Sequence, residues 1–448
     1  MSERPAPAPA DPPVRGSRGP RSPRRVALEV LLRVEEGAFA HLVLPDALRR
    51  SELSGRDRGF VTELVSGTLR EQRALDGALR RHCRRELDDL DPPVRAALRL
   101  GAYQLAHGVS PHAAIGETVG IVDEKVRGVV NAVLRSLQDR GVPDPRDARY
   151  IRNCYPRWIV EDLEHAYGAA DTAAMLAMMN EPAAPTLRVH GGAEPEAATL
   201  DAVRAEIEAA GGRVEQGALV PTAIVVRGAG DLARLEAIRA GRASVQDQAS
   251  QAVVALLDAQ PGDRIVDLAA APGGKAIAIA ETVGDRGLVV AGDLHEGRIR
   301  AMRRGAERIG PRSLVLFAGD GRGPPFRPGT FDRVLLDAPC SGLGVLRRRA
   351  DARHRVTREL VAEVAELQRA LLVEAATMVA PGGLLLYSVC TLTRAETAGI
   401  DAFAASELPD LVAADPPGPP WRKVGRGAVL LPHVAGTDGM FVLRLVRR

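Results

Sequence analysis

Residues 264–275 read RIVDLAAAPGGK, and this stretch decides the fold of the C-terminal half of the chain. An apolar run ends at Asp267 and leads into a turn with two adjacent glycines, Gly273 and Gly274. Paired glycines after a strand let the backbone approach a ligand closely, and the next helix points its N-terminus at the same place. The spacing matches neither a phosphate-binding P-loop nor the G-x-G-x-x-G dinucleotide motif.

Strand-like and helix-like segments alternate from this point to the C-terminus. After the first strand, apolar runs follow at residues 288–292, 314–317, 333–336 and 384–387, and two late runs at residues 429–431 and 441–445. Such alternation over about 200 residues predicts a doubly wound α/β domain with a parallel sheet.

Aspartates end three of the predicted strands: Asp293, Asp320 and Asp337. In an open parallel sheet the carboxyl ends of the strands line one crevice, and ligands bind there. Asp293 follows Gly273 by 20 residues, near the spacing at which an acidic side chain binds ribose hydroxyls. A cofactor that carries a nucleoside is therefore expected at this edge.

Two cysteines follow strand ends at the same edge. Cys340 lies in the segment DAPCSG after the fourth strand, and Cys390 lies in YSVCT after the fifth. A cysteine nucleophile acts as the thiolate, whereas a metal site would need more ligands than these two thiols. One reaction combines a thiol, a carboxyl group and a methyl-donating nucleoside: the thiolate adds to C6 of cytosine and C5 takes the methyl group. Asp337 is placed to stabilise the adduct at N3, but the sequence alone does not rank the thiols.

The 448 residues correspond to about three domains. We expect residues 1–25, rich in Pro and Arg, to form a disordered tail. Helical periodicity predicts an all-α bundle over residues 26–142, with a helix starting at Asp91-Pro92-Pro93. A small α+β region is expected at residues 143–240, with strands at 186–189 and 223–226, and the catalytic domain at residues 241–448.

Composition excludes several classes of protein. With 60 basic and 57 acidic residues the net charge is only +3, so whole-chain charge identifies no partner. No apolar run is long enough to span a membrane, and four scattered cysteines fit a reducing cytoplasm. The run Arg347-Arg348-Arg349 follows Cys340, and it is consistent either with contact to RNA phosphates or with a solvated charged face.

These motifs resemble those of the S-adenosylmethionine-dependent RNA 5-methylcytosine methyltransferases. QDQAS at residues 246–250 and DGMF at 438–441 also fit that family. The N-terminal part resembles the NusB-like RNA-binding fold, through the segments at residues 101–105, 112–118 and 131–135. The combination is similar to the Sun/Fmu-type enzymes that act on small-subunit (16S) ribosomal RNA.

The resemblance implies a role for each site residue. Asp293 would hold the ribose hydroxyls of S-adenosylmethionine, Asp320 would lie beside its adenine, and Asp337 would lie between cofactor and base. Cys390 would be the nucleophile, and Cys340 would assist breakdown of the adduct. The residues implied to surround the methionine and ribose are Ala269, Ala270, Ala271, Pro272, Gly273, Gly274 and Lys275. No metal is implied, RNA is the expected partner, and protein partners stay open.

Two other functions remain open from the sequence. A methyltransferase on the same fold could act on tRNA or on protein instead of ribosomal RNA. A non-catalytic RNA-binding or antitermination-like factor could retain a decayed methyltransferase domain, although the intact Cys340, Cys390 and Asp337 argue against decay.

Overall fold

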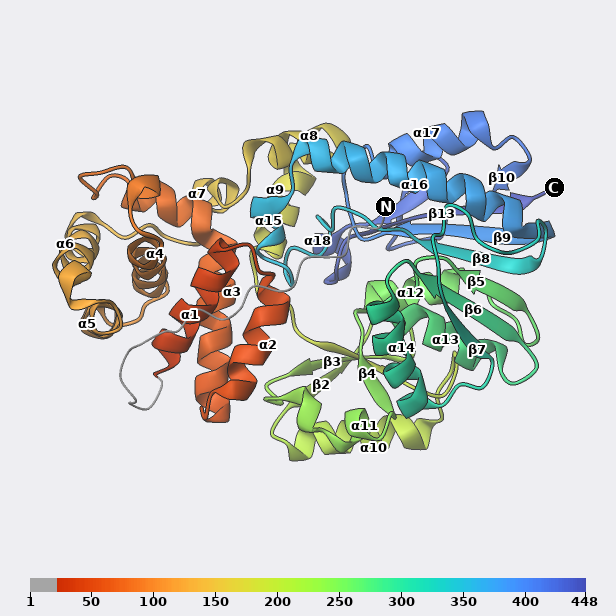
Figure 1. Ribbon diagram of the computed structural model, residues 1–448, viewed down its shortest axis with the longest axis horizontal. Helices are drawn as coiled ribbons and strands as arrows, with labels where there is room; N and C mark the ends of the chain where they lie inside the picture. Colours follow the sequence, from red (N-terminus) through yellow and green to blue (C-terminus); the bar gives the residue numbers. More distant parts are fainter. Residues whose placement is uncertain (1–21) are drawn as a thin grey trace, which may run out of the picture.

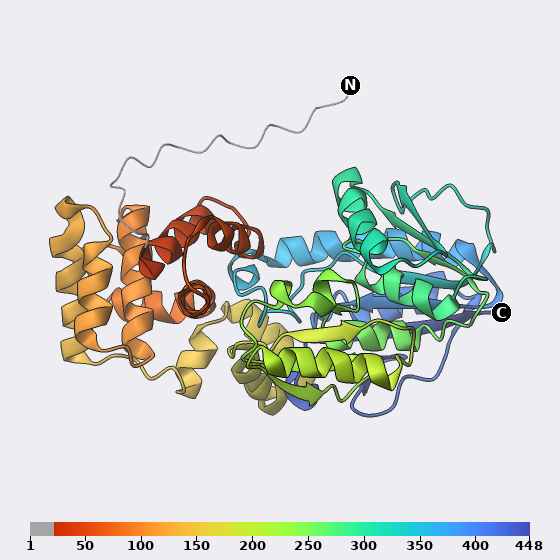
Figure 2. The same cartoon turned by 90° about the horizontal axis from the view of Figure 1, so that it is seen from below.

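The computed structural model describes residues 22–448, which form a helical bundle, a small sheet with flanking helices, and a large sheet covered on both faces (Figures 1 and 2). The bundle lies at one end of the elongated molecule and the large sheet at the other. Within the described range, no helix has the length and apolarity needed to cross a membrane.

Six helices form the N-terminal bundle around an apolar core of its own. Helix α4 begins at Pro92 directly after Asp91, as the sequence predicts. The bundle helices are α1 (Pro23–Glu35), α2 (Ala40–Arg50), α3 (Gly55–Leu79), α4 (Pro92–Ala106), α5 (Pro111–Gly120) and α6 (Glu124–Arg140).

The first helix corrects the predicted extent of the tail. Helix α1 already starts at Pro23, and the Ser22 hydroxyl accepts a hydrogen bond from the Arg25 amide. Arg24 is buried in the bundle, where it donates to Gln104 at 2.6 Å and contacts Glu117. The composition of residues 1–25 does not reveal this helix start, because Gln104 and Glu117, which bind Arg24, lie far along the chain. The rest of the predicted tail, residues 1–21, lies outside the described residues.

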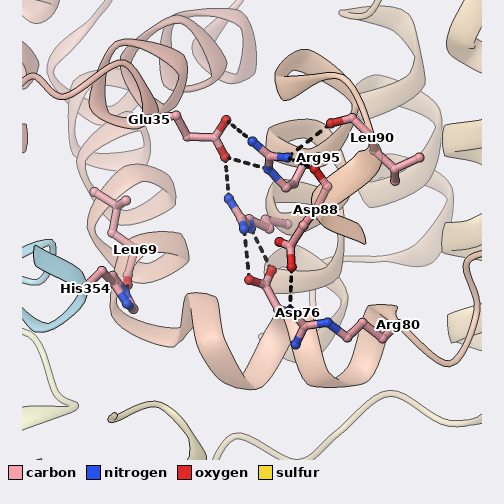
Figure 3. Close-up of polar contacts among 9 residues, drawn as sticks. Glu35, Leu69, Asp76, Arg80, Asp88, Leu90, Arg95 and His354 are labelled. Atoms are coloured by element: carbon pink, nitrogen blue, oxygen red, sulfur yellow. Dashed lines mark hydrogen bonds and ion pairs between the residues drawn. The ribbon is translucent and has the colours of Figure 1, made fainter. Parts of the chain in front are cut away.

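Ion pairs inside the bundle fix three of its helices relative to one another (Figure 3). Arg99 on α4 donates to both oxygens of Asp76 on α3, at 2.7 and 2.9 Å. Arg99 also contacts Glu35 at the end of α1, which accepts from Arg95 as well. Because removal of one partner would leave a buried charge unpaired, these contacts specify the packing of α1, α3 and α4.

Three short helices connect the bundle to the rest of the molecule: α7 (Ala148–Asn153), α8 (Arg157–Tyr167) and α9 (Ala169–Met179). Their apolar side chains pack into the core of the large-sheet domain. The Tyr167 hydroxyl donates to the backbone oxygen of Leu392 at 3.0 Å, just beyond Cys390. We call these three helices the connector. The connector thus holds in place the segment that carries Cys390, one of the two thiols.

The small sheet has four antiparallel strands in the order β2-β3-β1-β4. Both strands predicted in this region, at residues 186–189 and 223–226, are confirmed. Helices α10 (Ala197–Ala209) and α11 (Glu236–Arg239) lie along it (Figure 1). Its strands are β1 (Thr186–Val189), β2 (Arg213–Gln216), β3 (Ala223–Arg227) and β4 (Ala243–Val245).

The large sheet has the order β11-β12-β13-β9-β8-β5-β6-β7, and β10 pairs with β13. The five strands from β9 to the edge strand β7 are parallel, as predicted, but the late strands pair antiparallel, so the sheet is mixed. Strand β13 runs antiparallel to β12 because only residues 431–439, with the one-turn helix α18 (Pro432–Ala435), separate the two strands, which is too few for a crossover connection. The strands are β5 (Arg264–Asp267), β6 (Leu288–Asp293), β7 (Leu314–Ala318), β8 (Phe331–Asp337), β9 (Val379–Val389), β10 (Leu411–Ala413), β11 (Arg422–Val424), β12 (Gly427–Leu430) and β13 (Met440–Arg447).

Helices cover both faces of this sheet (Figure 1). Ile265 of β5 packs toward the helices α12 and α13, whereas the next residue, Val266, packs toward α16. Strands buried on both faces read as continuous apolar runs, which is why they stand out in the sequence. The helices are α12 (Gln248–Leu256), α13 (Gly274–Val283) and α14 (Glu296–Ile309) on one face, and α16 (Arg358–Met378) and α17 (Ala398–Glu407) on the other.

A segment at residues 349–356, which we call the strap, runs from the Cys340 loop to the bundle and contains α15 (Ala352–Arg355). His354 contacts the backbone oxygen of Leu69 on α3 at 2.7 Å (Figure 3). Burial lowers the pKa of His354 to about 4, so the neutral imidazole donates from Nε2. The strap therefore ties an active-site loop directly to the bundle.

Candidate active site

The glycine turn of residues 269–275 lies at the carboxyl end of β5. Gly273 has a φ of 101°, and a Cβ there would lie 2.5 Å from Cγ of Met302 on α14. The Ala270 amide donates to the Gly292 oxygen at 2.8 Å, so the turn is held against β6. Only glycine fits this closely packed, left-handed position, and α13 then starts at Gly274 with its first amides free toward the crevice.

Asp293 at the end of β6 and Asp320 just after β7 lie in adjacent loops. The two loops are joined by a hydrogen bond from the Gly319 amide to the Asp293 backbone oxygen at 3.1 Å. Asp293 is buried and accepts from the His295 amide at 2.8 Å. The Asp320 carboxylate instead lies at the surface, where Arg322 approaches it at 2.7 Å. The hydrogen bonds from Arg322 lower the pKa of Asp320.

Asp267 joins this group, although no role was predicted for it from the sequence. Its side chain is fully buried, and its Oδ2 finds no hydrogen-bond partner among the described residues. Burial, together with the charge of Asp337, raises the pKa of Asp267 to about 8. The sequence signal that could have identified Asp267 is its position at the end of an otherwise apolar strand. An unpartnered acid at this depth fits a ligand that carries positive charge.

Asp337 is held by two neighbours at the centre of the crevice. Lys275 approaches its Oδ2 at 2.7 Å, and the Ser388 hydroxyl donates to its Oδ1 at 2.8 Å. Burial disfavours the charge on Lys275, but the contact with Asp337 outweighs this and raises the pKa of the lysine. Helix α13, through Lys275, and strand β9, through Ser388, thus meet at one carboxylate.

The two thiols lie side by side, with Sγ of Cys340 and Sγ of Cys390 3.3 Å apart. Both cysteines are half-buried at the carboxyl ends of β8 and β9. The hydrogen bond from Cys340 lowers the pKa of Cys390, and Lys275 and Arg349 act in the same direction. The same bond, with burial and nearby negative charge, raises the pKa of Cys340. These opposite shifts favour Cys390 as the thiolate of the pair.

The sequence also gave no role to Glu396, which is fully buried behind the two thiols. Its carboxylate accepts hydrogen bonds from Ser341 and from Thr391, the residues that follow the two cysteines. Glu396 lies six residues beyond Cys390, and this spacing matches no catalytic motif, so only the fold identifies the residue.

Two of the three arginines in the run Arg347-Arg348-Arg349 are bound within the protein, and phosphate contact by the run stays a prediction. Arg347 donates to the backbone oxygens of Gly436 and Pro182, and Arg348 bridges Asp247 and Asp438 at 2.6 and 2.9 Å. These partners come from distant segments, which a charge run does not reveal. Arg349 is exposed, and its side chain has no hydrogen bond or ion pair within residues 22–448.

Fold and crevice together define the C-terminal domain as a methyltransferase domain of the S-adenosylmethionine-dependent type, joined to a NusB-like bundle. Family models match three parts of the chain: "16S rRNA methyltransferase RsmB/F" over residues 254–446, "NusB family" over residues 21–139, and an RsmF/B-like ferredoxin-like domain over residues 155–233. The chain belongs to the RsmB/F methyltransferase family, which confirms the predicted bundle and catalytic fold.

Full-length relatives have the same organisation. The Bacillus subtilis protein named "Probable ribosomal RNA small subunit methyltransferase B" is 34% identical, and the alignment covers 95% of this chain and 99% of the relative. The ribosomal RNA small subunit methyltransferase B of Thermus thermophilus is 33% identical, over 95% and 98%. Among solved structures, PH0851 matches with a TM-score of 0.80 at 24% identity, over 96% of this chain and 99% of that one, which shows a shared fold.

Among residues 22–448, no group of three or more His, Cys, Asp or Glu side chains has the arrangement of a metal site.

Proposed function

We propose that this protein transfers a methyl group from S-adenosylmethionine to C5 of a cytosine in small-subunit (16S) ribosomal RNA, through a covalent bond between Cys390 and the base. The observation that carries the proposal is the pair of thiols 3.3 Å apart beside the Lys275–Asp337 contact. The choice of ribosomal RNA rests on the names of the relatives.

The residues of the crevice fit the cofactor. S-adenosylmethionine would supply the methyl group, and it carries two positive charges, on its ammonium and sulfonium groups. The unpartnered Oδ2 of Asp267 suits such a ligand. The turn of residues 269–275 would surround its methionine and ribose, buried Asp293 would accept from the ribose hydroxyls, and Asp320 would lie near the adenine.

The chain's own groups account for the proton and bond changes at the base. The Cys390 thiolate forms a bond to C6, and the displaced electron pair reaches N3, where Asp337 and Lys275 supply a proton. Carbon 5 is then nucleophilic. After methylation, the C5 proton is released to solvent, the N3 proton returns to the Asp337–Lys275 pair, and the bond between C6 and Cys390 breaks, which restores the aromatic ring and the Cys390 thiolate. Cys340 lies close enough to Cys390 to take part in this second stage.

The RNA would be held by the bundle and the small sheet through shape and phosphate contacts. The target base must leave its stack to reach thiols set in a crevice.

The direct test is to incubate the purified protein with S-adenosylmethionine and unmodified 16S ribosomal RNA, with tRNA in a parallel reaction. We expect 5-methylcytidine in digests of the ribosomal RNA by mass spectrometry. Methylation of tRNA alone would overturn the substrate. Absence of product on both RNAs, together with no cofactor binding by calorimetry, would favour the non-catalytic RNA-binding alternative.

Arg349 is the one arginine of the run that is free to contact RNA phosphate near the thiols. We expect Arg349→Ala to raise the KM for RNA about tenfold and to reduce the salt dependence of RNA binding by about one charge. The KM for S-adenosylmethionine should change little. Filter binding at several salt concentrations, together with initial rates, measures both effects.

The matched control is Arg286→Ala, which removes an exposed arginine from the loop before β6, at the opposite edge of the sheet. If both variants bind RNA as the unmodified protein does, Arg349 makes no phosphate contact.

A further inference from the structure

A single buried carboxylate connects the loops that carry the two thiols. Glu396 follows Cys390 in the loop before α17, and its side chain is 0% exposed. Five donors converge on its two oxygens: the Ser341 amide at 2.8 Å, the Ser341 hydroxyl, Thr391 at 3.1 Å, Thr393 at 2.7 Å and Gln368 at 3.0 Å. An acceptor-only group satisfies all five, which favours the ionised carboxylate.

The donors include the immediate neighbours of both cysteines. Ser341 follows Cys340, Thr391 follows Cys390, and their hydroxyls also contact each other at 2.8 Å. The Gly344 amide closes the arrangement by donating to the Cys390 backbone oxygen at 3.0 Å. The separation of the two sulfur atoms is therefore set by bonds that meet at Glu396.

Helix α16 fixes the position of this carboxylate from the other side. Gln368 donates both to Glu396 and to the backbone oxygen of Pro339, at 2.9 Å, just before Cys340. The Tyr387 hydroxyl lies 2.9 Å from the side-chain oxygen of Gln368 and 2.9 Å from the backbone oxygen of Glu396, and its single hydrogen can be donated to either. A fully satisfied buried network of this kind is rigid.

We infer that Glu396 is a positioning residue that joins the Cys340 and Cys390 loops and determines which of the two thiols keeps the proton. This inference rests on the proposed cytosine-C5 chemistry for its role in the reaction, but not for its structural content.

The charges around the pair are distributed unequally. The bond from Cys390 and burial raise the pKa of Cys340, and the negative charges of Glu396 and Asp337 raise it further. The bond from Cys340 lowers the pKa of Cys390 against burial and Asp337, and the positive charges of Lys275 and Arg349 lower it further. Asp337 acts on both thiols, so beside the bond between the thiols the unequal charges are Glu396, which acts on Cys340, and the two cations, which act on Cys390. In this proposal the pair shares one proton, these charges favour its position on Cys340, and Cys390 is the attacking thiolate.

The test compares Glu396→Gln with Asp401→Asn. Glutamine keeps the size of the side chain but loses the charge, and it turns an NH₂ group toward donors. Asp401 is also buried and lies five residues further on, but it binds Arg426, away from the thiols. The readout is the alkylation rate of each cysteine by iodoacetamide between about pH 6 and pH 9, followed by peptide mass spectrometry without RNA or cofactor.

In the unmodified protein we expect Cys390 to react at least about tenfold faster than Cys340, since thiolate reacts and thiol does not. Glu396→Gln should reduce this ratio about tenfold, which is the effect of one pKa unit, and Asp401→Asn should leave it unchanged. With RNA, kcat of Glu396→Gln should fall about 10- to 100-fold while the KM for S-adenosylmethionine stays constant. Thr391→Val removes one hydrogen-bond donor to Glu396 and should change the ratio of alkylation rates in the same direction but by less. This variant replaces Glu396→Gln in the test if Glu396→Gln does not fold.

An unchanged ratio in a folded Glu396→Gln or Thr391→Val variant would overturn the inference, as would an equal change in Asp401→Asn. Because alkylation needs no substrate, these results are separate from the proposed function. If the unmodified protein forms no 5-methylcytidine, the proposed function fails while the ratios still decide the role of Glu396.

Discussion

Replacement of Cys390 by alanine is expected to abolish methyl transfer to RNA, with a loss of about 10⁴-fold or more. In the proposed reaction the Cys390 thiolate makes C5 of the base nucleophilic, and in the variant burial and the charge of Glu396 still raise the pKa of Cys340, so Cys340 should not substitute for it. Tritium transfer from labelled S-adenosylmethionine to RNA measures the loss, and calorimetry should show cofactor binding close to that of the unmodified protein.

The partner variant Cys340→Ala should behave differently. Cys390 can still attack, but the adduct should break down more slowly, so a covalent protein–RNA complex should accumulate and appear as a slower band on a denaturing gel. Turnover should fall about 100-fold. The proposed roles fail if Cys390→Ala retains full methyl transfer and Cys340→Ala forms no adduct.

The sequence reveals the site residues that directly follow the end of a strand. Asp337, Cys340 and Cys390 directly follow apolar runs, and the carboxyl ends of parallel strands converge. The structure brings these residues together with Lys275. The sequence could not rank the thiols, because the ranking depends on charges contributed by four separate segments.

What the sequence could not reveal are contacts between polar groups far apart in the chain. Arg348 looks like part of a solvated charge run, but it is held between Asp247 and Asp438, about 100 residues away on either side. Arg24 looks like part of a tail, but it bonds to Gln104. Hydrophobic periodicity reports which faces are buried, and it carries no information about which buried polar groups pair. Glu396 was missed for the same reason.

Replacement of Arg353 in the strap is expected to cause a large loss of stability and of turnover. The Arg353 side chain is fully buried between three parts of the molecule. Its guanidinium donates to the backbone oxygens of Arg70 on α3 and of Met179 on α9, at 2.8 and 3.2 Å, and to the Asn180 side chain at 3.1 Å. It also stacks on Tyr155, 4.3 Å from the ring centroid. The bundle, the connector and the active-site loop therefore meet at one side chain.

Arg353→Ala should destabilise this junction by about 3 kcal/mol, since three buried oxygens lose a donor at roughly 1 kcal/mol each. Hydrogen exchange should increase in α3 and across residues 340–356, and kcat should fall because the Cys340 loop continues into the strap. The control is Arg358→Ala, which removes an exposed ion pair with Glu161 on α8 and should cost less than about 1 kcal/mol. Equal exchange and equal rates in the two variants would mean that the bundle is joined to the catalytic domain by apolar packing and not through Arg353. A loss of kcat confined to Arg353→Ala, with faster exchange on both sides of the strap, would mean that the position of the bundle is transmitted to the thiols through this segment.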